Sequence, residues 1–152
     1  MTQPDDEKIS LKFPKTERLA PLTLIAALFT KGESEYAYPL RMTFRLIEAG
    51  SIPPELRADC LQLMVNVPKK KFKRAVKRVR LRRLMREAWR LQRVPLRERI
   101  KSELPGKILH VGIVYVGSEE LPFPTVKAKT AKLLAHLDKK LFTSPDDEKK
   151  SE

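Results

Sequence analysis

A dense run of basic side chains is the part of this sequence best suited to chemistry. Residues 69–93 hold thirteen Lys or Arg and one acid, Glu87, whereas the rest of the 152-residue chain is almost balanced in charge. Nearly all of the net charge of +13 therefore lies in this segment. An arginine guanidinium can donate two hydrogen bonds to the oxygens of one phosphate and can stack on a base, and a lysine adds a single positive charge. The segment is predicted to bind a polyanion, because an ordinary solvated helix face would carry acids spaced to pair with its bases.

Residues that would support protein-based catalysis are sparse. The five glycines are scattered and none opens a phosphate-binding loop, so nucleotide hydrolysis is not indicated. His110 and His136 fall in unrelated segments without metal-ligand spacing, and a packed or surface role is expected for each. Cys60 is the only cysteine, which leaves no disulfide framework and no thiolate cluster. We therefore expect no catalytic residue and no metal site in the protein itself.

The composition is that of a folded protein rather than of a disordered basic tail. With 41% apolar residues the chain can bury a core. Its first residues are polar and acidic, and no run approaches the length of a membrane span, so a cytoplasmic location is expected. We expect a single domain over residues 10–142, with flexible tails at 1–9 and 143–152.

Hydrophobic periodicity predicts six main elements in the order α, β, β, α, β, α. Their expected ranges are helix 21–31, strand 40–47, strand 59–67, helix 72–93, strand 108–116 and a final helix capped by Thr125. A short helical piece, 96–102, follows the long basic helix. The first two strands are joined by a loop rich in Gly and Pro and are predicted to pair as a hairpin, and strand 108–116 is apolar enough to be central. This order predicts an α+β fold, an α/β sandwich around a small sheet.

The apolar residues of the basic helix change sides along its length. At about 100° per residue, one side of the first half collects Phe72, Ala75, Val76 and Val79. The opposite side of the second half collects Leu81, Leu84, Met85, Ala88 and Trp89. The second half is therefore predicted to dock on the sheet. A row of guanidinium groups then faces solvent or a ligand, and it comprises Arg80, Arg83, Arg86 and Arg90.

Four aromatic residues near the N-terminus are candidates for stacking on unpaired bases. They are Phe13, Phe29, Tyr36 and Tyr38. Core packing is the alternative reading of each ring, and for Phe29, on the apolar face of its helix, it is at least as well supported. Phe13 lies in an extended Phe-Pro-Lys before that helix, which favours stacking.

Residues 67–90 match a specific pattern. A strand ends in Val67-Pro68 and consecutive lysines, Ala75-Val76 follows, and the helix continues through Arg78-Val79-Arg80 to Arg86-Glu87 and Trp89. This run resembles the signature of the bacterial ribonuclease P protein component. The flanking matches are Phe13-Pro14-Lys15, Arg18-Leu19, Lys31-Gly32 and Leu121-Pro122-Phe123, so the likeness covers about residues 9–142.

Some positions depart from the family pattern. Val79 stands where the family has Asn, which removes an amide that could hydrogen-bond a phosphate or a metal-bound water. Arg82 replaces a usual Lys and keeps the charge. Ile25 stands where relatives often have an aromatic residue, and the loop 48–57 looks longer than theirs.

The resemblance implies a fold and a function. The fold would be a compact α/β sandwich like that of ribosomal protein S5, with a left-handed β-α-β crossover within residues 61–116. The function would be that of the protein subunit of ribonuclease P, which removes 5′ leaders from precursor tRNA with Mg²⁺ bound mainly by the RNA subunit. The RNA is then the catalyst, and the partners are this catalytic RNA and precursor tRNA, with no membrane and no protein partner.

The resemblance also implies two sets of site residues in this RNA-binding domain. The set that binds the RNA subunit comprises Lys69, Lys70, Lys71, Arg74, Arg78, Arg80, Arg82, Arg83, Arg86 and Arg90. The set in a cleft between the first helix and the sheet, which receives the single-stranded leader, comprises Phe13, Lys15, Arg18 and Phe29.

Other polyanion-binding functions share the same electrostatics. A structural, ribosomal-type RNA-binding protein would show the basic helix but has no need of the Phe13 cleft. A DNA-binding module is disfavoured because the arginines occupy several faces and Gln92 is the only amide on the helix that could read bases. A membrane-surface helix is weaker still, because sheet packing explains the apolar face of the second half.

Overall fold

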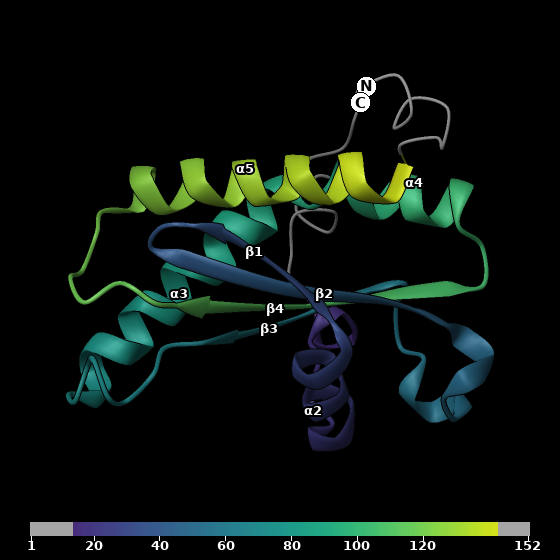
Figure 1. The fold of residues 1–152 in the computed structure, drawn as a ribbon, viewed down its shortest axis with the longest axis horizontal. Helices are drawn as coiled ribbons and strands as arrows, with labels where there is room; N and C mark the ends of the chain where they lie inside the picture. Colours follow the sequence, from purple (N-terminus) through teal and green to yellow (C-terminus); the bar gives the residue numbers. More distant parts are fainter. Residues whose placement is uncertain (1–13, 143–152) are drawn as a thin grey trace.

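A four-stranded sheet organises the chain, with three helices on one face and one helix on the other (Figure 1). The computed structural model describes residues 14–142. The sheet order is β1-β2-β4-β3, and the strands are β1 Glu33–Ala37, β2 Leu40–Glu48, β3 Leu61–Asn66 and β4 Lys107–Tyr115. The helices are α2 Leu22–Lys31, α3 Ala75–Gln92, α4 Val94–Glu103 and α5 Phe123–Phe142. Short 3-10 helices lie at η1 Lys15–Glu17, η2 Ala49–Ser51 and η3 Pro54–Leu56.

The predicted α+β class is confirmed, and all the predicted helices and strands are present with bounds shifted by a few residues. The predicted tails, 1–9 and 143–152, and Phe13 lie outside the described residues. Helices α3 and α4 join the parallel neighbours β3 and β4, which gives the expected β-α-β unit. The left-handedness of its crossover stays a prediction.

The predicted hairpin between strands 40–47 and 59–67, which are β2 and β3 in the structure, is wrong. Strand β2 instead pairs antiparallel with β1 on one side and with β4 on the other. Strand β3 pairs parallel with β4, so β4 lies between β2 and β3 and is central, as its apolar sequence predicted. Strand β1 was not predicted, because Glu33–Ala37 is polar and largely exposed and has no alternating pattern. Strands β1 and β2 form the hairpin that the structure does contain, with only two residues between them.

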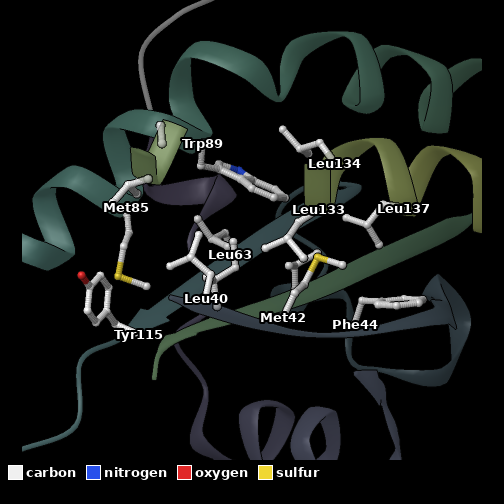
Figure 2. Close-up of a cluster of buried hydrophobic side chains, with 14 of the residues drawn as sticks. Leu40, Met42, Phe44, Leu63, Met85, Trp89, Tyr115, Leu133, Leu134 and Leu137 are labelled. Carbon is white, nitrogen blue, oxygen red and sulfur yellow. The ribbon is translucent and has the colours of Figure 1, made fainter. Parts of the chain in front are cut away.

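The main core lies between the sheet and helices α3, α4 and α5 (Figure 2). Met85 and Trp89 of α3 are buried there, together with Leu133 and Leu137 of α5. The change of sides along α3 is therefore confirmed: Leu81 is fully buried, whereas the valines of the first turns are exposed. The helix begins at Ala75 rather than at residue 72, since Phe72 packs into the core from the preceding turn.

Helix α2 packs on the opposite face of the sheet through Leu24 and Leu28. Two glycines make this contact possible. A Cβ on Gly32 would lie 2.8 Å from the backbone carbonyl oxygen of Phe44 in β2, and a Cβ on Gly112 of β4 would lie 2.7 Å from Phe29 Cζ. Glycine at position 32 therefore lets the end of α2 approach the backbone of the sheet, and a side chain at position 112 would require the Phe29 ring to shift.

Candidate nucleic-acid interface

Helix α3 and the turn before it present the predicted basic surface. Lys69 and Lys70 are exposed in the turn, Arg74 and Arg83 are exposed on the helix and its cap, and Arg82 is half-buried. The buried side of α3 anchors the helix in the core, so these side chains project from a rigid support. Because the helix backbone is already ordered, only the freedom of the side chains is lost when they bind phosphates.

Four arginines form a tight cluster along one side of this surface. Burial, together with the charges of Arg18, Arg82 and Arg83, lowers the pKa of Arg86 from its ordinary value. Arg18, Arg83 and Arg86 also line one shallow hollow with Arg90. Within residues 14–142, no carboxylate pairs with Arg82, Arg83 or Arg86. Cations clustered in this way repel one another and attract a polyanion.

Other residues predicted to bind RNA also have structural partners. Lys71 Nζ donates to the carbonyl of Val116 at 2.9 Å. The Arg78 guanidinium donates to the carbonyls of Phe72 and Lys73 at 2.7 and 2.9 Å, which fixes the turn before α3. These hydrogen bonds hold the side chains in place and leave their charges intact.

Two further arginines of the predicted set have acidic partners. Arg80 Nη1 lies 3.4 Å from Glu120 Oε1, and Arg90 Nε donates to Glu87 Oε2 at 2.9 Å. Hydrogen bonding with Glu87 raises the pKa of Arg90 and lowers that of Glu87. Arg90 is therefore partly neutralised, and its contribution to RNA binding should be smaller than that of Arg83 or Arg86.

A buried ion pair attaches the segment before α2 to the end of α3. Glu17 and Arg93 are only 3% and 2% exposed, and the guanidinium meets both carboxylate oxygens at 3.0 and 2.9 Å. Residues 18 and 19 then run beside the edge strand β3, where the amide of Leu19 donates to the carbonyl of Leu63 at 2.9 Å. This attachment places Arg18 next to the arginines of α3 and leaves Lys15 exposed nearby.

Buried polar contacts strengthen the same attachment. Gln62 Nε2 donates to the carbonyl of Thr16 at 3.2 Å, and Gln62 Oε1 lies 3.2 Å from His110 Nε2. Burial and the charge of Arg45 lower the pKa of His110 to about 4. His110 is therefore a neutral core residue that orients Gln62, which agrees with the packed role expected for it.

Ion pairs of Arg97 lie beside the same segment. The guanidinium of Arg97 meets the two oxygens of Asp59 at 3.0 and 2.9 Å, and its Nε lies 3.8 Å from Glu17 Oε1. Burial alone would raise the pKa of Asp59, but the hydrogen bonds and charge of Arg97 hold it below its usual value. Arg97 thus links β3, α4 and the segment that carries Lys15 and Arg18.

A second surface lies on the face of the sheet that α2 covers only in part. The register aligns Tyr36, Arg41, Val114 and Asn66 in one row across all four strands. The neighbouring row contains Gly112, which Phe29 of α2 covers, so the first row forms a floor beside that helix. Tyr36 and Asn66 are exposed, and Arg41 and Val114 are half-buried.

Arg41 is the charged centre of this floor. Its guanidinium carbon lies 5.7 Å from the centre of the Tyr36 ring, within the range of a cation–π contact. Among residues 14–142, Arg41 Nε is the only buried side-chain nitrogen or oxygen without a hydrogen-bond partner. A buried donor without a partner is costly unless a ligand supplies the acceptor.

Comparison with known proteins decides the family. The sequence model of the Ribonuclease P family matches residues 13–138. The chain belongs to the ribonuclease P protein family. It is 38% identical over 125 residues to the ribonuclease P protein component of Porphyromonas gingivalis, covering 81% of this chain and 84% of the relative. The corresponding protein of Chlorobium phaeobacteroides is 32% identical over 114 residues, covering 73% and 75%.

A solved structure shares the fold. The Staphylococcus aureus RNase P protein superposes with a TM-score of 0.55 at 14% identity, over 80% of this chain and 94% of that one. Membership of the family makes the chain a protein component of ribonuclease P, a ribonucleoprotein endoribonuclease of tRNA processing, and implies that it associates with the ribonuclease P RNA.

The described residues offer no donor set for a metal ion. In residues 14–142, no group of three His, Cys, Asp or Glu side chains gathers in one place. The acids near the basic surface, Glu17, Glu87 and Glu120, already pair with arginines. The side chains of residues 14–142 therefore offer no set of ligands that fits Mg²⁺. No helix in the same range is long and apolar enough to span a membrane, and the cytoplasmic location stays a prediction.

The structure places Arg18, predicted for the leader cleft, near the arginines of α3, and it places Phe29 over Gly112 on the sheet. The assignment of both residues to a leader-binding cleft stays a prediction. Glu17 and Arg93 were not predicted as positioning residues, because 76 positions separate them. Arg41 was not predicted as a site residue either, because one arginine in a strand gives no signal until its neighbours are known.

Proposed function

We propose that this protein binds the catalytic RNA of ribonuclease P through α3 and the 5′ leader of precursor tRNA through the floor beside α2. It thereby promotes the Mg²⁺-dependent endonucleolytic removal of the leader, which leaves the mature tRNA 5′ end. The observation that carries this proposal is the presence of two different surfaces, one with clustered arginines and one with exposed Tyr36 and Phe29 rings and the Arg41 guanidinium beside Tyr36.

The arginine surface suits a folded RNA. Arg82 and Arg83 add their charges to that of Arg86, and within residues 14–142 none of these three guanidinium groups pairs with a carboxylate, so all three are available to phosphates. Neutralising several phosphates releases counterions, so the affinity should fall steeply as the salt concentration rises. Phosphate contacts fix position without reading sequence, as a subunit that docks on one large RNA requires.

The floor beside α2 suits a single strand. Tyr36 and Phe29 are 64% and 39% exposed and offer ring faces to unpaired bases. The half-buried Arg41 guanidinium carries a positive charge beside the Tyr36 ring, and a leader phosphate would pair with that charge. Lys15 adds positive charge to the exposed segment before α2. A surface with exposed rings and positive charge binds a strand with little sequence preference, which fits leaders of varied sequence.

The chemistry of cleavage belongs to the RNA in this proposal. Mg²⁺ is held mainly by the RNA subunit and supplies the activated nucleophile and charge stabilisation there. The protein's cations screen the repulsion between two RNA molecules, which helps substrate and metal ions to bind. No protein side chain is given the role of nucleophile or general base.

The test is multiple-turnover cleavage of precursor tRNA at low Mg²⁺ by the cognate catalytic RNA, with and without the full-length protein. The variants are Arg83→Ala with Arg86→Ala for the RNA surface, and Arg41→Ala for the leader floor. Lys132→Ala removes an exposed cation from α5 and is the matched control. Each variant is measured on precursors with a long and with a very short leader.

The two surfaces predict different outcomes. The double arginine variant should lose stimulation on both substrates, because it binds the RNA subunit less well. Arg41→Ala should lose stimulation only on the long-leader precursor, by about tenfold in kcat/KM. Salt-sensitive binding to the RNA without any stimulation would leave a structural RNA-binding protein. In that event Val79→Asn is the first reversion to make, since this position departs from the family.

A further inference from the structure

The first turns of α3 carry an apolar strip that the fold leaves uncovered. Val76 and Val79 are 70% and 38% exposed, and with Ala75 they line a hollow whose other walls are Arg80 and Arg83. Figure 1 shows this end of α3 beyond the tips of β3 and β4. The strip therefore contributes little to the core, and a role for it must come from outside the folded chain.

We propose that this strip receives the face of an unstacked nucleobase of the RNA, while Arg80 and Arg83 bind the phosphates on either side. The inference rests on the proposed role of α3 in binding the catalytic RNA. In this proposal Val76 and Val79 make an apolar contact with the RNA. Neither the basic composition of the helix nor the family membership predicts that contact.

Charge around the strip favours RNA over an apolar protein surface. Glu120 lies 3.6 Å from Lys77 Nζ and 3.4 Å from Arg80 Nη1, so it holds these two cations together on one flank. Arg83 is exposed on the other wall. Any occupant must place an apolar face between cations, and a nucleotide can do so because each base is joined through its sugar to negatively charged phosphates.

The occupant must be an unpaired base. In a paired A-form helix the base faces are covered by their neighbours, and only sugars, phosphates and groove edges are accessible. A strip of aliphatic side chains has no donor or acceptor to read a groove edge. It gains free energy only by covering an apolar face, which a bulged or looped nucleotide exposes.

The strip is rigid before the RNA arrives. The Arg78 guanidinium donates to the carbonyls of Phe72 and Lys73, which fixes the turn that leads into α3. Phe72 is buried, and its ring meets that of Tyr115 edge to face at 5.7 Å. A preformed surface avoids the ordering cost that a flexible one incurs on binding.

The experiment compares binding of the full-length protein to its catalytic RNA across a range of salt concentrations. The variant Val76→Thr with Val79→Thr keeps the shape and the β-branching of both side chains and makes them polar, so the helix should be retained. Its affinity should fall about tenfold at every salt concentration with an unchanged salt slope, because the lost contact is apolar. Arg83→Ala should instead reduce the slope by about one.

Leu22→Thr is the matched control, since Leu22 of α2 is 82% exposed and lies outside the strip. It should leave the affinity for the catalytic RNA unchanged. A double valine variant that binds as the wild type does, as it would if the strip bound a protein instead, overturns the inference. A loss that disappears at high salt also overturns it. Because the readout is binding, failure of the wild type to stimulate cleavage would count against the proposed function and not against the strip.

Discussion

Removing the Glu17 carboxylate should show how strongly the segment before α2 is held. In Glu17→Ala the guanidinium of Arg93 stays 2% exposed and loses both carboxylate contacts, at 3.0 and 2.9 Å, while it keeps its hydrogen bond to the carbonyl of Arg90. Arg97 loses a carboxylate at 3.8 Å. The variant therefore leaves a buried positive charge without its main partner.

The cost follows from that burial. Removing one partner of a buried ion pair typically destabilises a protein by 3–5 kcal/mol, and the remaining contact of Arg93 places this case at about 3 kcal/mol. For a domain of this size the loss corresponds to a fall in Tm of about 10 °C. Urea unfolding at pH 7 gives the free energy, and a thermal scan gives the Tm.

The control is Glu98→Gln, because the Glu98 side chain is exposed and lies 3.5 Å from Arg97 Nη1 in an ordinary surface ion pair. It should cost no more than about 0.5 kcal/mol. The double replacement Glu17→Leu with Arg93→Met removes both charges and should recover most of the stability. If Glu17→Ala costs no more than Glu98→Gln, the assignment of this pair as the anchor of the segment is refuted.

Two further predictions concern the sheet. Because the folded pKa of His110 is about 4 and the unfolded value is about 6.5, the unfolded chain binds the extra proton between these values. The stability should therefore fall by about 3 kcal/mol as pH drops through that window, and urea titrations of His110→Gln should lose most of this slope. Gly112→Ala would place a Cβ 2.7 Å from Phe29 Cζ, so thermal unfolding should show a loss of about 1–3 kcal/mol. Gly50→Ala, with nothing within 4 Å, should change stability by less than about 0.5 kcal/mol, and equal effects at the two glycines would contradict this argument.

Local hydrophobic patterns predicted the helices and strands better than they predicted which strands pair. The change of apolar sides along α3 correctly placed Leu81, Met85 and Trp89 in the core, because helical periodicity depends only on neighbouring residues. The predicted hairpin was wrong because the alternation of apolar and polar residues shows that a segment is a strand with one buried face. It does not show which other strand pairs with it. Strand β4 is far along the chain and enters between β2 and β3, so the pairing is decided by tertiary packing.

The site was predictable where one segment carries it and not where several segments meet. The basic segment pointed to the arginines of α3, because thirteen Lys or Arg within 25 residues can be recognised from the sequence alone. The row from Tyr36 to Asn66 is assembled by the register of four strands, so its members are separated in the sequence. Arg41 gained significance only when its buried Nε proved to have no partner.

In the proposed function, the arginine cluster also makes the stability of the protein depend on its RNA. Burial lowers the pKa of Arg86, and the charges of Arg18, Arg82 and Arg83 lower it further, because like charges oppose one another in the free chain. Phosphates would relieve this repulsion, and a ligand that binds only the folded state raises the free energy of unfolding by RT ln(1 + [L]/Kd). Copies of the protein without RNA would then unfold and be degraded sooner than bound copies. The side chains that bind RNA would in this way match the amount of the protein in the cell to the amount of RNA available to it.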